Sequence, residues 1–435
     1  MMKYNFSEIK ESKNYIKVGN TEEIVNEIAN EEAIEVRSRF KKVIEPWLSA
    51  ALQSEHLSLL IGAGLTTAVC QIAKVSSSSM GTANFGDDFS EKVNKYAQKA
   101  AEEMGRGNPN IEDQIRTATA LLRGYEIDEK EDEANKLGNK LDDVLSSFAN
   151  SILSSETNLF KELIQGNSSA IKASAVLQSF LFTFASRNST RERTHIFTTN
   201  YDRFLEYGCD MAGIKILDRF WGKIIPRFQE SPSNMDYYYH ASDSKNEFRY
   251  AEGVVRYTKI HGSIDWYENN GIVYRDALRF GADEVNLPSG TTYRDHLMIY
   301  PNSMKSVETA FYPYAELFRD FSSAIVKPNS TLFVYGYGFG DTHINKIIKE
   351  MMSVPSTHIV IIAYNVDDRL VNFLSKINMV QVTLLTGSEF ANLENLVEYY
   401  LPKAAIDIIT ETASRLVDSR KGYLDFQNIE EAANE

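Results

Sequence analysis

The chain has 435 residues, which is enough for one large α/β domain with insertions or for two or three smaller units. It carries 46 lysines and arginines against 60 aspartates and glutamates, and the resulting net charge of −14 argues against a broad nucleic-acid-binding face. The two cysteines, Cys70 and Cys209, form no CxxC pair, so nothing indicates a zinc ribbon or a disulfide framework.

The beginning of the chain has no apolar core after basic residues, so it does not resemble a secretory signal. No apolar run approaches the roughly 18 residues needed to cross a bilayer, and the cysteine usage fits a reducing compartment. We therefore expect a soluble, cytoplasmic protein without membrane contact. Residues 22–54 mix charged with apolar residues, a pattern typical of amphipathic helices, and predict an N-terminal helical collar over residues 1–54.

The apolar run at residues 57–61 ends in Gly62-Ala63-Gly64 and predicts a buried strand that turns into a helix. Such a turn collects unpaired backbone N–H groups and the positive end of a helix dipole, which suits a phosphate. At Gly64 a Cβ would hold a pyrophosphate away from the backbone. Taken alone, the same motif is equally compatible with a plain tight connection between strand and helix.

Residues 76–86 are small and polar and predict a mobile loop near this turn. From Phe89 to about Phe184 the chain is rich in Ala, Glu, Lys and Leu, which predicts several helices. We place this helical insertion at about residues 85–190, within a nucleotide-binding domain of residues 55–400. A C-terminal helix and an acidic tail are expected over residues 401–435.

The second half of the chain alternates strands with helices. Strands are predicted at residues 194–199, 254–260, 298–301, 331–335, 358–364 and 380–385, and helices after Tyr201, over 311–326 and over 342–352. The Tyr-rich stretch at residues 220–250 fits neither pattern. Strands that are apolar on both faces and alternate with helices favour an α/β fold, a Rossmann-like parallel sheet with helices on both faces.

Five predicted strands end in small or polar residues. These ends have the sequences GAGLT, TTNYD, HGS, GYGFGD and AYN. Ligands of open parallel sheets bind beyond the carboxyl ends of the strands, so segments far apart in sequence can meet in one crevice. The sequence therefore predicts a shared ligand site at this edge.

The motifs at these ends resemble the sirtuin family of NAD-consuming enzymes. The matching segments are Gly62-Ala63-Gly64-Leu65-Thr66, Thr198-Thr199-Asn200-Tyr201-Asp202, His261-Gly262-Ser263 and Gly336 to Asp341. The resemblance spans about residues 57–387, with the helical stretch as an interruption. It implies that the chain binds NAD as a substrate.

The resemblance also implies roles for individual residues. Asn200 would orient the ribose or an attacking water, His261 would act as the general base, and Asp202 would hold the nicotinamide side. Asn365 would reach the adenosine ribose. The remaining contacts to NAD would come from Gly62, Ala63, Gly64, Thr66, Thr199, Gly336 and Gly338. No histidine spacing suggests a metal site, and none is expected.

These roles have structural alternatives. Asn200 could simply cap the following helix, and His261 could be a histidine that stabilises a turn. For Asp341 the sequence favours a helix cap at Thr342 over a catalytic role.

The chain departs from the protein deacylases of the family in one respect that bears on the reaction. It has no four-cysteine zinc ribbon between the T-x-N-x-D motif and the end of the HG region, so one wall of an acyl-peptide groove is missing, and water becomes the plausible nucleophile in place of an acyl oxygen. The overall pattern resembles the sirtuin-like NAD hydrolases of bacterial anti-phage defence, in particular the subunit that assembles with a HerA-type hexameric ATPase. This resemblance implies NAD depletion upon infection, a homo-oligomer and activity controlled by assembly.

Two other functions remain open from the sequence. The chain could be a regulatory module that binds NAD or ADP-ribose without turnover and gates a partner ATPase. It could also be an NAD-dependent protein deacylase, which would consume NAD only with an acyl-lysine peptide.

Overall fold

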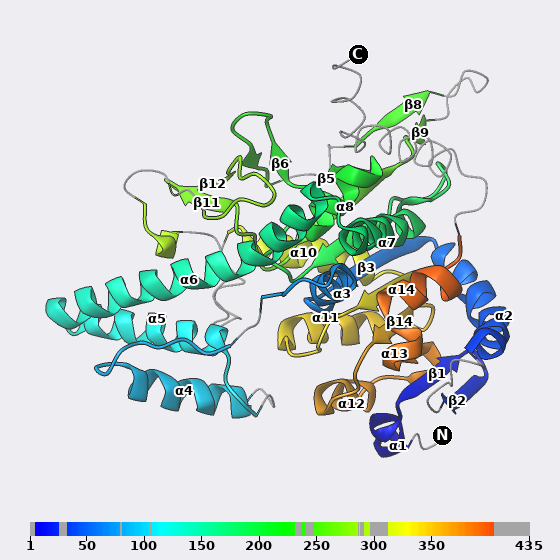
Figure 1. The fold of residues 1–435 in the computed structure, drawn as a ribbon, viewed down its shortest axis with the longest axis horizontal. Helices are drawn as coiled ribbons and strands as arrows, with labels where there is room; N and C mark the ends of the chain where they lie inside the picture. The colour runs from blue at the N-terminus through cyan, green and yellow to red at the C-terminus, as the bar shows by residue number, and fades with distance from the viewer. Residues whose placement is uncertain are drawn as a thin grey trace, which may run out of the picture.

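The computed structural model describes residues 5–25, 33–78, 81–103, 107–230, 236–240, 248–285, 287, 291–295 and 312–403. Its centre is a nine-stranded sheet with the order β2-β1-β15-β14-β13-β3-β4-β10-β5 (Figure 1). The strands are β1 (Asn14–Val18), β2 (Thr21–Val25), β3 (His56–Ile61), β4 (His195–Thr198), β5 (Lys215–Leu217), β10 (Val254–Lys259), β13 (Ser330–Tyr335), β14 (His358–Ala363) and β15 (Val382–Thr386). The strands from β15 to β5 all pair in parallel, which confirms the predicted Rossmann-like α/β fold.

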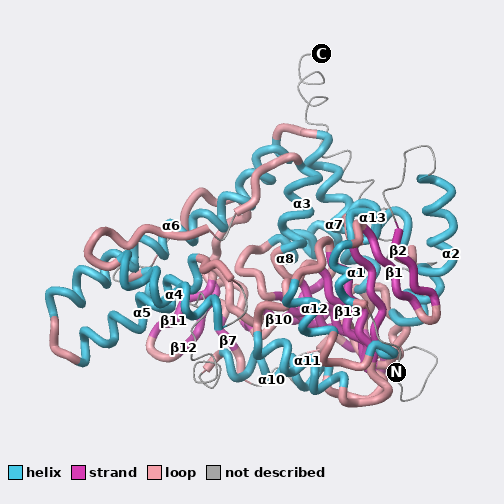
Figure 2. Tube along the Cα trace, turned by 90° about the horizontal axis from the view of Figure 1, so that it is seen from below, coloured by secondary structure: helices cyan, strands magenta, loops and turns pink. Residues whose placement is uncertain are grey.

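Helices cover both faces of this sheet. One layer comprises α2 (Ala33–Leu52), α3 (Gly64–Ala73), α7 (Ser168–Ala185) and α8 (Phe204–Ala212), and the other comprises α1 (Phe6–Glu11), α10 (Tyr314–Ile325), α11 (Thr342–Met352) and α12 (Asp368–Leu374). Side chains alternate between the layers along each strand. On β13, Phe333 and Tyr335 pack with the first layer, whereas Leu332 and Val334 pack with the second. Figure 2 shows α3 and α7 on one side of the strands and α10 and α11 on the other.

The helices predicted between Phe89 and Phe184 are confirmed, and they divide into two groups. Helices α4 (Ser90–Glu103), α5 (Ile111–Ile127) and α6 (Glu131–Ile164) project away from the sheet (Figure 1) and bury their own apolar core. That core also contains Tyr201 and Ile264, which follow β4 and β10. In contrast, α7 packs on the sheet. The projecting helices are thus joined to the carboxyl ends of two central strands.

The Tyr-rich stretch at residues 220–250 contributes short strands outside the main sheet. A four-stranded sheet consists of β6 (Phe220–Trp221), β7 (Arg227–Phe228), β11 (Trp266–Asn269) and β12 (Ile272–Arg275), and a separate hairpin consists of β8 (Tyr238–His240) and β9 (Phe248–Tyr250). Phe220, Phe228 and Trp266 form an aromatic core in the four-stranded sheet. Such two- and three-residue strands are too short to produce a periodic pattern in the sequence.

The N-terminal segment is not purely helical, which corrects the expected collar. Helix α2 is present, but β1 and β2 form a hairpin, and β1 pairs antiparallel with β15 to extend the main sheet. Residues 21–25, which the sequence placed in the helical collar, form β2. Their side chains alternate between less and more exposed, as expected for an edge strand. The strand expected at residues 298–301 and most of the expected C-terminal helix and tail, residues 404–435, lie outside the described residues.

A half-buried histidine links the sheet to α2. His358 begins β14, and its Nε2 lies 2.8 Å from the Thr383 hydroxyl, which also accepts a hydrogen bond from the indole of Trp47. Burial lowers the pKa of His358 to about 4, and the nearby charge of Lys17 contributes. The folded state therefore favours the neutral imidazole.

Because the pKa of His358 is lower in the folded chain than in the unfolded chain, its contribution to stability is present above about pH 6.5 and is lost as the pH falls toward 4. Between pH 7 and pH 4 we expect a loss of roughly 3 kcal/mol from this residue. Urea unfolding of the wild type and of His358→Gln over this range measures it. The difference in stability between the two proteins should shrink as the pH falls, and a difference independent of pH would contradict the assignment.

Candidate functional site

Two glycine turns at the carboxyl ends of β3 and β13 pack directly against each other. The N–H of Gly62 donates to the Tyr335 carbonyl at 3.1 Å, and the N–H of Gly64 donates to the Gly336 carbonyl at 3.0 Å. A Cβ added to Gly62 would lie 2.5 Å from the Gly336 oxygen, and one added to Gly64 would lie 2.6 Å from the Gly336 Cα. The glycines are therefore required by backbone contact between the turns, a reason different from the ligand approach inferred from the sequence.

The turn nevertheless leaves donors open at the start of α3. The backbone N–H groups of Ala63 and Thr66 have no hydrogen-bond acceptor among the described residues, and Ala63 is exposed. These groups lie at the positive end of the helix dipole, where an anion is stabilised. The turn can therefore hold a phosphate group.

A cavity of about 350 Å³ opens beside this turn, a volume within the range of small-molecule sites. Nine of the predicted site residues line it: Gly62, Ala63, Thr66, Thr199, Asn200, Asp202, His261, Gly336 and Gly338. The other two, Gly64 and Asn365, line a neighbouring cavity of about 460 Å³. Both cavities share Thr67 and Gly336, so they meet at the glycine turns.

Asn200 follows β4 and is 7% exposed. Its side-chain amide donates to the Gly62 carbonyl and to the Thr66 hydroxyl, each at 3.2 Å. Its side-chain oxygen is buried and has no partner among the described residues. A buried acceptor without a donor is costly, so this oxygen is suited to bind a hydroxyl group or a water in the cavity. The alternative role of Asn200 as a helix cap is not observed, because α8 begins only at Phe204.

Asp202 supports Asn200 through the same hydroxyl group. Thr66 donates to one carboxylate oxygen of Asp202 at 2.7 Å, and the Phe204 N–H donates to the other at 3.2 Å. Burial raises the pKa of Asp202, whereas the charge of Lys259 opposes this shift. Asp202 thus lines the cavity while both of its oxygens contact protein donors.

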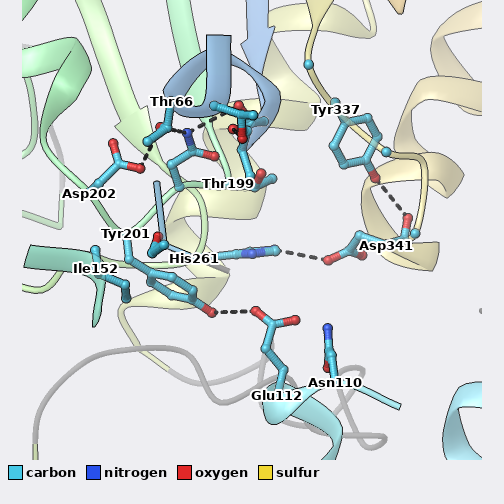
Figure 3. Close-up of a pocket in the computed structure, with 18 of the residues that line it drawn as sticks. Thr66, Asn110, Glu112, Ile152, Thr199, Tyr201, Asp202, His261, Tyr337 and Asp341 are labelled. Carbon is cyan, nitrogen blue, oxygen red and sulfur yellow. Dashed lines mark hydrogen bonds and ion pairs between the residues drawn. The ribbon is translucent and has the colours of Figure 1, made fainter. Parts of the chain in front are cut away.

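His261 follows β10 and contacts Asp341 at the start of α11. Its Nε2 lies 3.0 Å from one oxygen of Asp341 (Figure 3). The other oxygen of Asp341 accepts hydrogen bonds from the N–H groups of His343 and Ile344. Asp341 therefore caps α11, as the sequence favoured, and also orients His261. With Nε2–H directed at a carboxylate, the second ring nitrogen of His261 is the one that can accept a proton.

Residues 194–380 match the family model described as SIR2-like domain. This match supports a sirtuin-like family and implies the use of NAD. A comparison with curated proteins found no match. The SIR2-like region contains the segments of Asn200, His261 and Gly336, and it begins after the glycine turn of β3.

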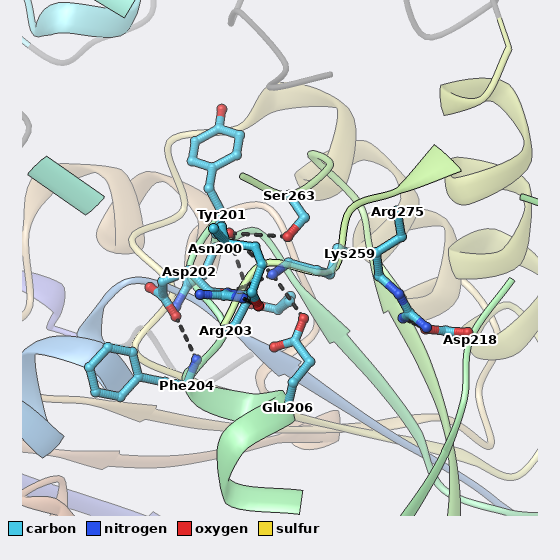
Figure 4. Close-up of polar contacts among 12 residues, drawn as sticks. Asn200, Tyr201, Asp202, Arg203, Phe204, Glu206, Asp218, Lys259, Ser263 and Arg275 are labelled. Carbon is cyan, nitrogen blue, oxygen red and sulfur yellow. Dashed lines mark hydrogen bonds and ion pairs between the residues drawn. The ribbon is translucent and has the colours of Figure 1, made fainter. Parts of the chain in front are cut away.

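Buried polar contacts hold the T-x-N-x-D segment at residues 198–202 (Figure 4). The ammonium of Lys259 donates to the carbonyls of Tyr201 and Asp202 at 3.2 and 2.5 Å and also contacts Glu206 at 3.0 Å. Lys259 is only 2% exposed, and these oxygens compensate the cost of burying its charge. The backbone that carries Asn200 is thereby tied to the end of β10, which carries His261.

A second buried contact ties the motif to the projecting helices. Glu156 of α6 is fully buried and accepts hydrogen bonds from the Arg203 N–H at 2.8 Å and from its guanidinium at 2.6 Å. Burial raises the pKa of Glu156 to about 7, although the charge of Arg203 opposes this shift. The helix α6 thus fixes the residue directly after Asp202.

Several residues that line the cavity were given no contact with the ligand by the sequence, although Tyr201, Tyr337 and Asp341 lie within the predicted TTNYD and GYGFGD segments. They include Ser78, Asn110, Glu112, Ile152, Tyr201, Tyr337, Asp341 and Arg369. Asn110, Glu112 and Ile152 come from the projecting helices, and Arg369 comes from α12. The spacing of Asn110 and Asp113 fits a capping box, which indicates where α5 begins. It does not indicate that the start of α5 lines the cavity.

Two findings bear on other classes of site. No group of three or more potential metal ligands occurs among the residues that the structure describes. Within the same residues, no helix combines the length and the apolar character needed to cross a lipid bilayer.

The contact between the glycine turns yields a stability prediction. Gly62→Ala should destabilise the fold by about 1–3 kcal/mol, because the new Cβ collides with the backbone of the β13 turn. Gly124→Ala is the matched control: nothing lies within 4 Å of its Cβ position, and alanine favours a helix interior by roughly 0.5–1 kcal/mol. Denaturant unfolding should shift in opposite directions for the two variants. If the two variants changed the unfolding free energy equally, the turns after β3 and β13 could move apart without a loss of stability.

Proposed function

We propose that the protein is an NAD hydrolase that cleaves NAD into nicotinamide and ADP-ribose. The observation that carries this proposal is one cavity that contains an unpartnered buried oxygen on Asn200, the His261–Asp341 pair and the open N–H groups at the start of α3. The SIR2-like match supports NAD as the ligand.

The volumes of the two neighbouring cavities, and the residues Thr67 and Gly336 that line both, support an extended dinucleotide. In the proposed arrangement, the pyrophosphate contacts the N–H groups of Ala63 and Thr66, and the guanidinium of Arg369 faces it from α12. The adenosine occupies the neighbouring cavity lined by Gly64 and Asn365. The nicotinamide ribose then lies on the side of Asn200 and His261.

The proposed reaction breaks the bond between the ribose C1′ and the nicotinamide nitrogen. The electron pair of this bond leaves with nicotinamide, which becomes neutral, and positive charge develops on the ribose. The side-chain oxygen of Asn200 holds a ribose hydroxyl or the attacking water. Water forms the new bond at C1′ and transfers its proton to His261, which Asp341 orients.

The biological role belongs to the same proposal. The resemblance of the motifs to sirtuin-like NAD hydrolases of anti-phage defence supports an effector that depletes NAD in the cytoplasm, as a homo-oligomer assembled with a HerA-type ATPase hexamer. A regulatory module that binds NAD or ADP-ribose without turnover is the main alternative, and a deacylase is the second.

Incubation of the purified protein with NAD, with nicotinamide measured by chromatography, distinguishes these functions. Release without peptide supports hydrolysis, release only with an acyl-lysine peptide supports deacylation, and ADP-ribose binding without release supports the regulatory module. Because activity is proposed to depend on assembly, the assay includes the oligomer obtained with the ATPase partner.

Asn200→Ala and His261→Ala should each lower kcat for nicotinamide release by about 10²–10⁴-fold, because each removes a group that acts on the ribose or on water. His56→Ala serves as the control, since His56 lies at the opposite end of β3 and contacts Glu192. Steady-state kinetics on folded variants measures the effect. Full activity of both site variants would refute the site assignment.

Asp341→Asn should separate helix capping from the orientation of His261. Asparagine caps helices as well as aspartate, so the melting temperature should change little, whereas kcat should fall at least about tenfold because the carboxylate at His261 is lost. Thermal melting and kinetics on the same preparation test this. An unchanged kcat would mean that Asp341 acts only as a cap.

A further inference from the structure

The projecting helices contribute directly to the cavity that contains Asn200 and His261. Asn110 and Glu112 at the start of α5 line this cavity, together with Ile152 of α6 (Figure 3). These residues lie outside the SIR2-like region. The cavity is therefore completed by a part of the chain to which no motif assigns a function.

The first turn of α5 is held in a fixed position. The side chain of Asn110 accepts a hydrogen bond from the Asp113 N–H, and the carboxylate of Asp113 accepts one from the Asn110 N–H, each at 3.1 Å. Asp113 is fully buried. Glu112 lies within this capping box, and its half-buried side chain extends into the cavity.

Tyr201 positions the carboxylate of Glu112. The Tyr201 hydroxyl donates to Glu112 Oε1 at 3.4 Å, and its ring contacts the ring of Phe148 of α6 and the imidazole of His261. Burial raises the pKa of Tyr201 well above its usual value, so the hydroxyl keeps its proton and acts as a donor. Tyr201 occupies a variable position of the T-x-N-x-D motif and connects it to α5.

The three carboxylates that line the cavity differ in the partners they already have. Both oxygens of Asp202 contact protein donors, and both oxygens of Asp341 are used by His261 and by the cap of α11. Glu112 Oε2 has no hydrogen-bond or ion-pair partner among the described residues, so it is the carboxylate oxygen that remains open to a ligand.

We propose that Glu112 is a further catalytic residue, whose carboxylate faces the nicotinamide ribose and stabilises the positive charge that develops there. This role rests on the proposed NAD hydrolysis. Glu112 forms no covalent bond: the electron pair of the broken bond leaves with nicotinamide, and water supplies the new bond to C1′. A fixed carboxylate in a site shielded from water stabilises such charge more effectively than solvent does.

The test compares Glu112→Gln with Glu126→Gln. Glutamine at position 112 keeps the shape and an acceptor for Tyr201 but lacks the charge, whereas Glu126 is an exposed residue of the same helix that does not line the cavity. We expect Glu112→Gln to lower kcat for nicotinamide release by about 100-fold, with KM and the Kd for ADP-ribose changed less than about threefold. Glu126→Gln should match the wild type in all three quantities.

Glu112→Asp provides a second measurement. Aspartate restores the charge on a shorter side chain, so its kcat should lie above that of Glu112→Gln. Melting temperatures of all variants identify any loss of folding. If Glu112→Gln does not fold, Glu112→Asp serves as the test: the inference then requires that this variant lowers kcat while KM changes little.

Three outcomes would overturn the inference. If the wild type releases nicotinamide and Glu112→Gln retains its kcat, the carboxylate has no catalytic role, while the proposed function stands. If Glu112→Gln raises KM and the Kd for ADP-ribose with kcat unchanged, Glu112 only binds the ligand. If the wild type binds ADP-ribose but releases no nicotinamide in its assembled form, the proposed function fails and the role of Glu112 fails with it.

Discussion

The structure depends on the backbone contact between the turns that follow β3 and β13. Each of these neighbouring parallel strands is followed directly by a glycine, and the hydrogen bonds of Gly62 and Gly64 join the turns with no space for a side chain between them. This close approach places the start of α3 beside the loop that leads to Asp341. The free N–H groups, the side chain of Asn200 and the His261–Asp341 pair consequently surround one cavity.

The motif at residues 198–202 connects the two parts of the molecule. On one side, Asn200 and Asp202 contact the glycine turn through Thr66. On the other side, Tyr201 packs into the core of the projecting helices, and Arg203 forms a buried ion pair with Glu156 of α6. Breaking such a pair leaves an uncompensated buried charge, so the helices and the motif are expected to keep a fixed relation. The projecting helices thereby determine the geometry of the cavity.

Much of the sheet could be predicted from the sequence, because its central strands are continuous apolar runs that end in polar or small residues. The same rule located Asn200 and His261, since parallel strands present their carboxyl ends at one edge. Glu112 could not be found this way, because its place follows from how α5 packs and not from a strand end. The hairpin of β1 and β2 was missed because its two five-residue strands contain charged residues. Asp341 was assigned only its local role as a cap, because its contact with His261 joins residues 80 positions apart.

The two edges of the large sheet have a consequence for self-association. One edge is β2, which carries Glu22 and Glu23, and the other is β5, which has only three residues and begins with Lys215. Charged and very short border strands discourage another chain from adding a strand. The nine-stranded sheet is therefore expected to end within each copy of the chain and not to continue from one copy into the next.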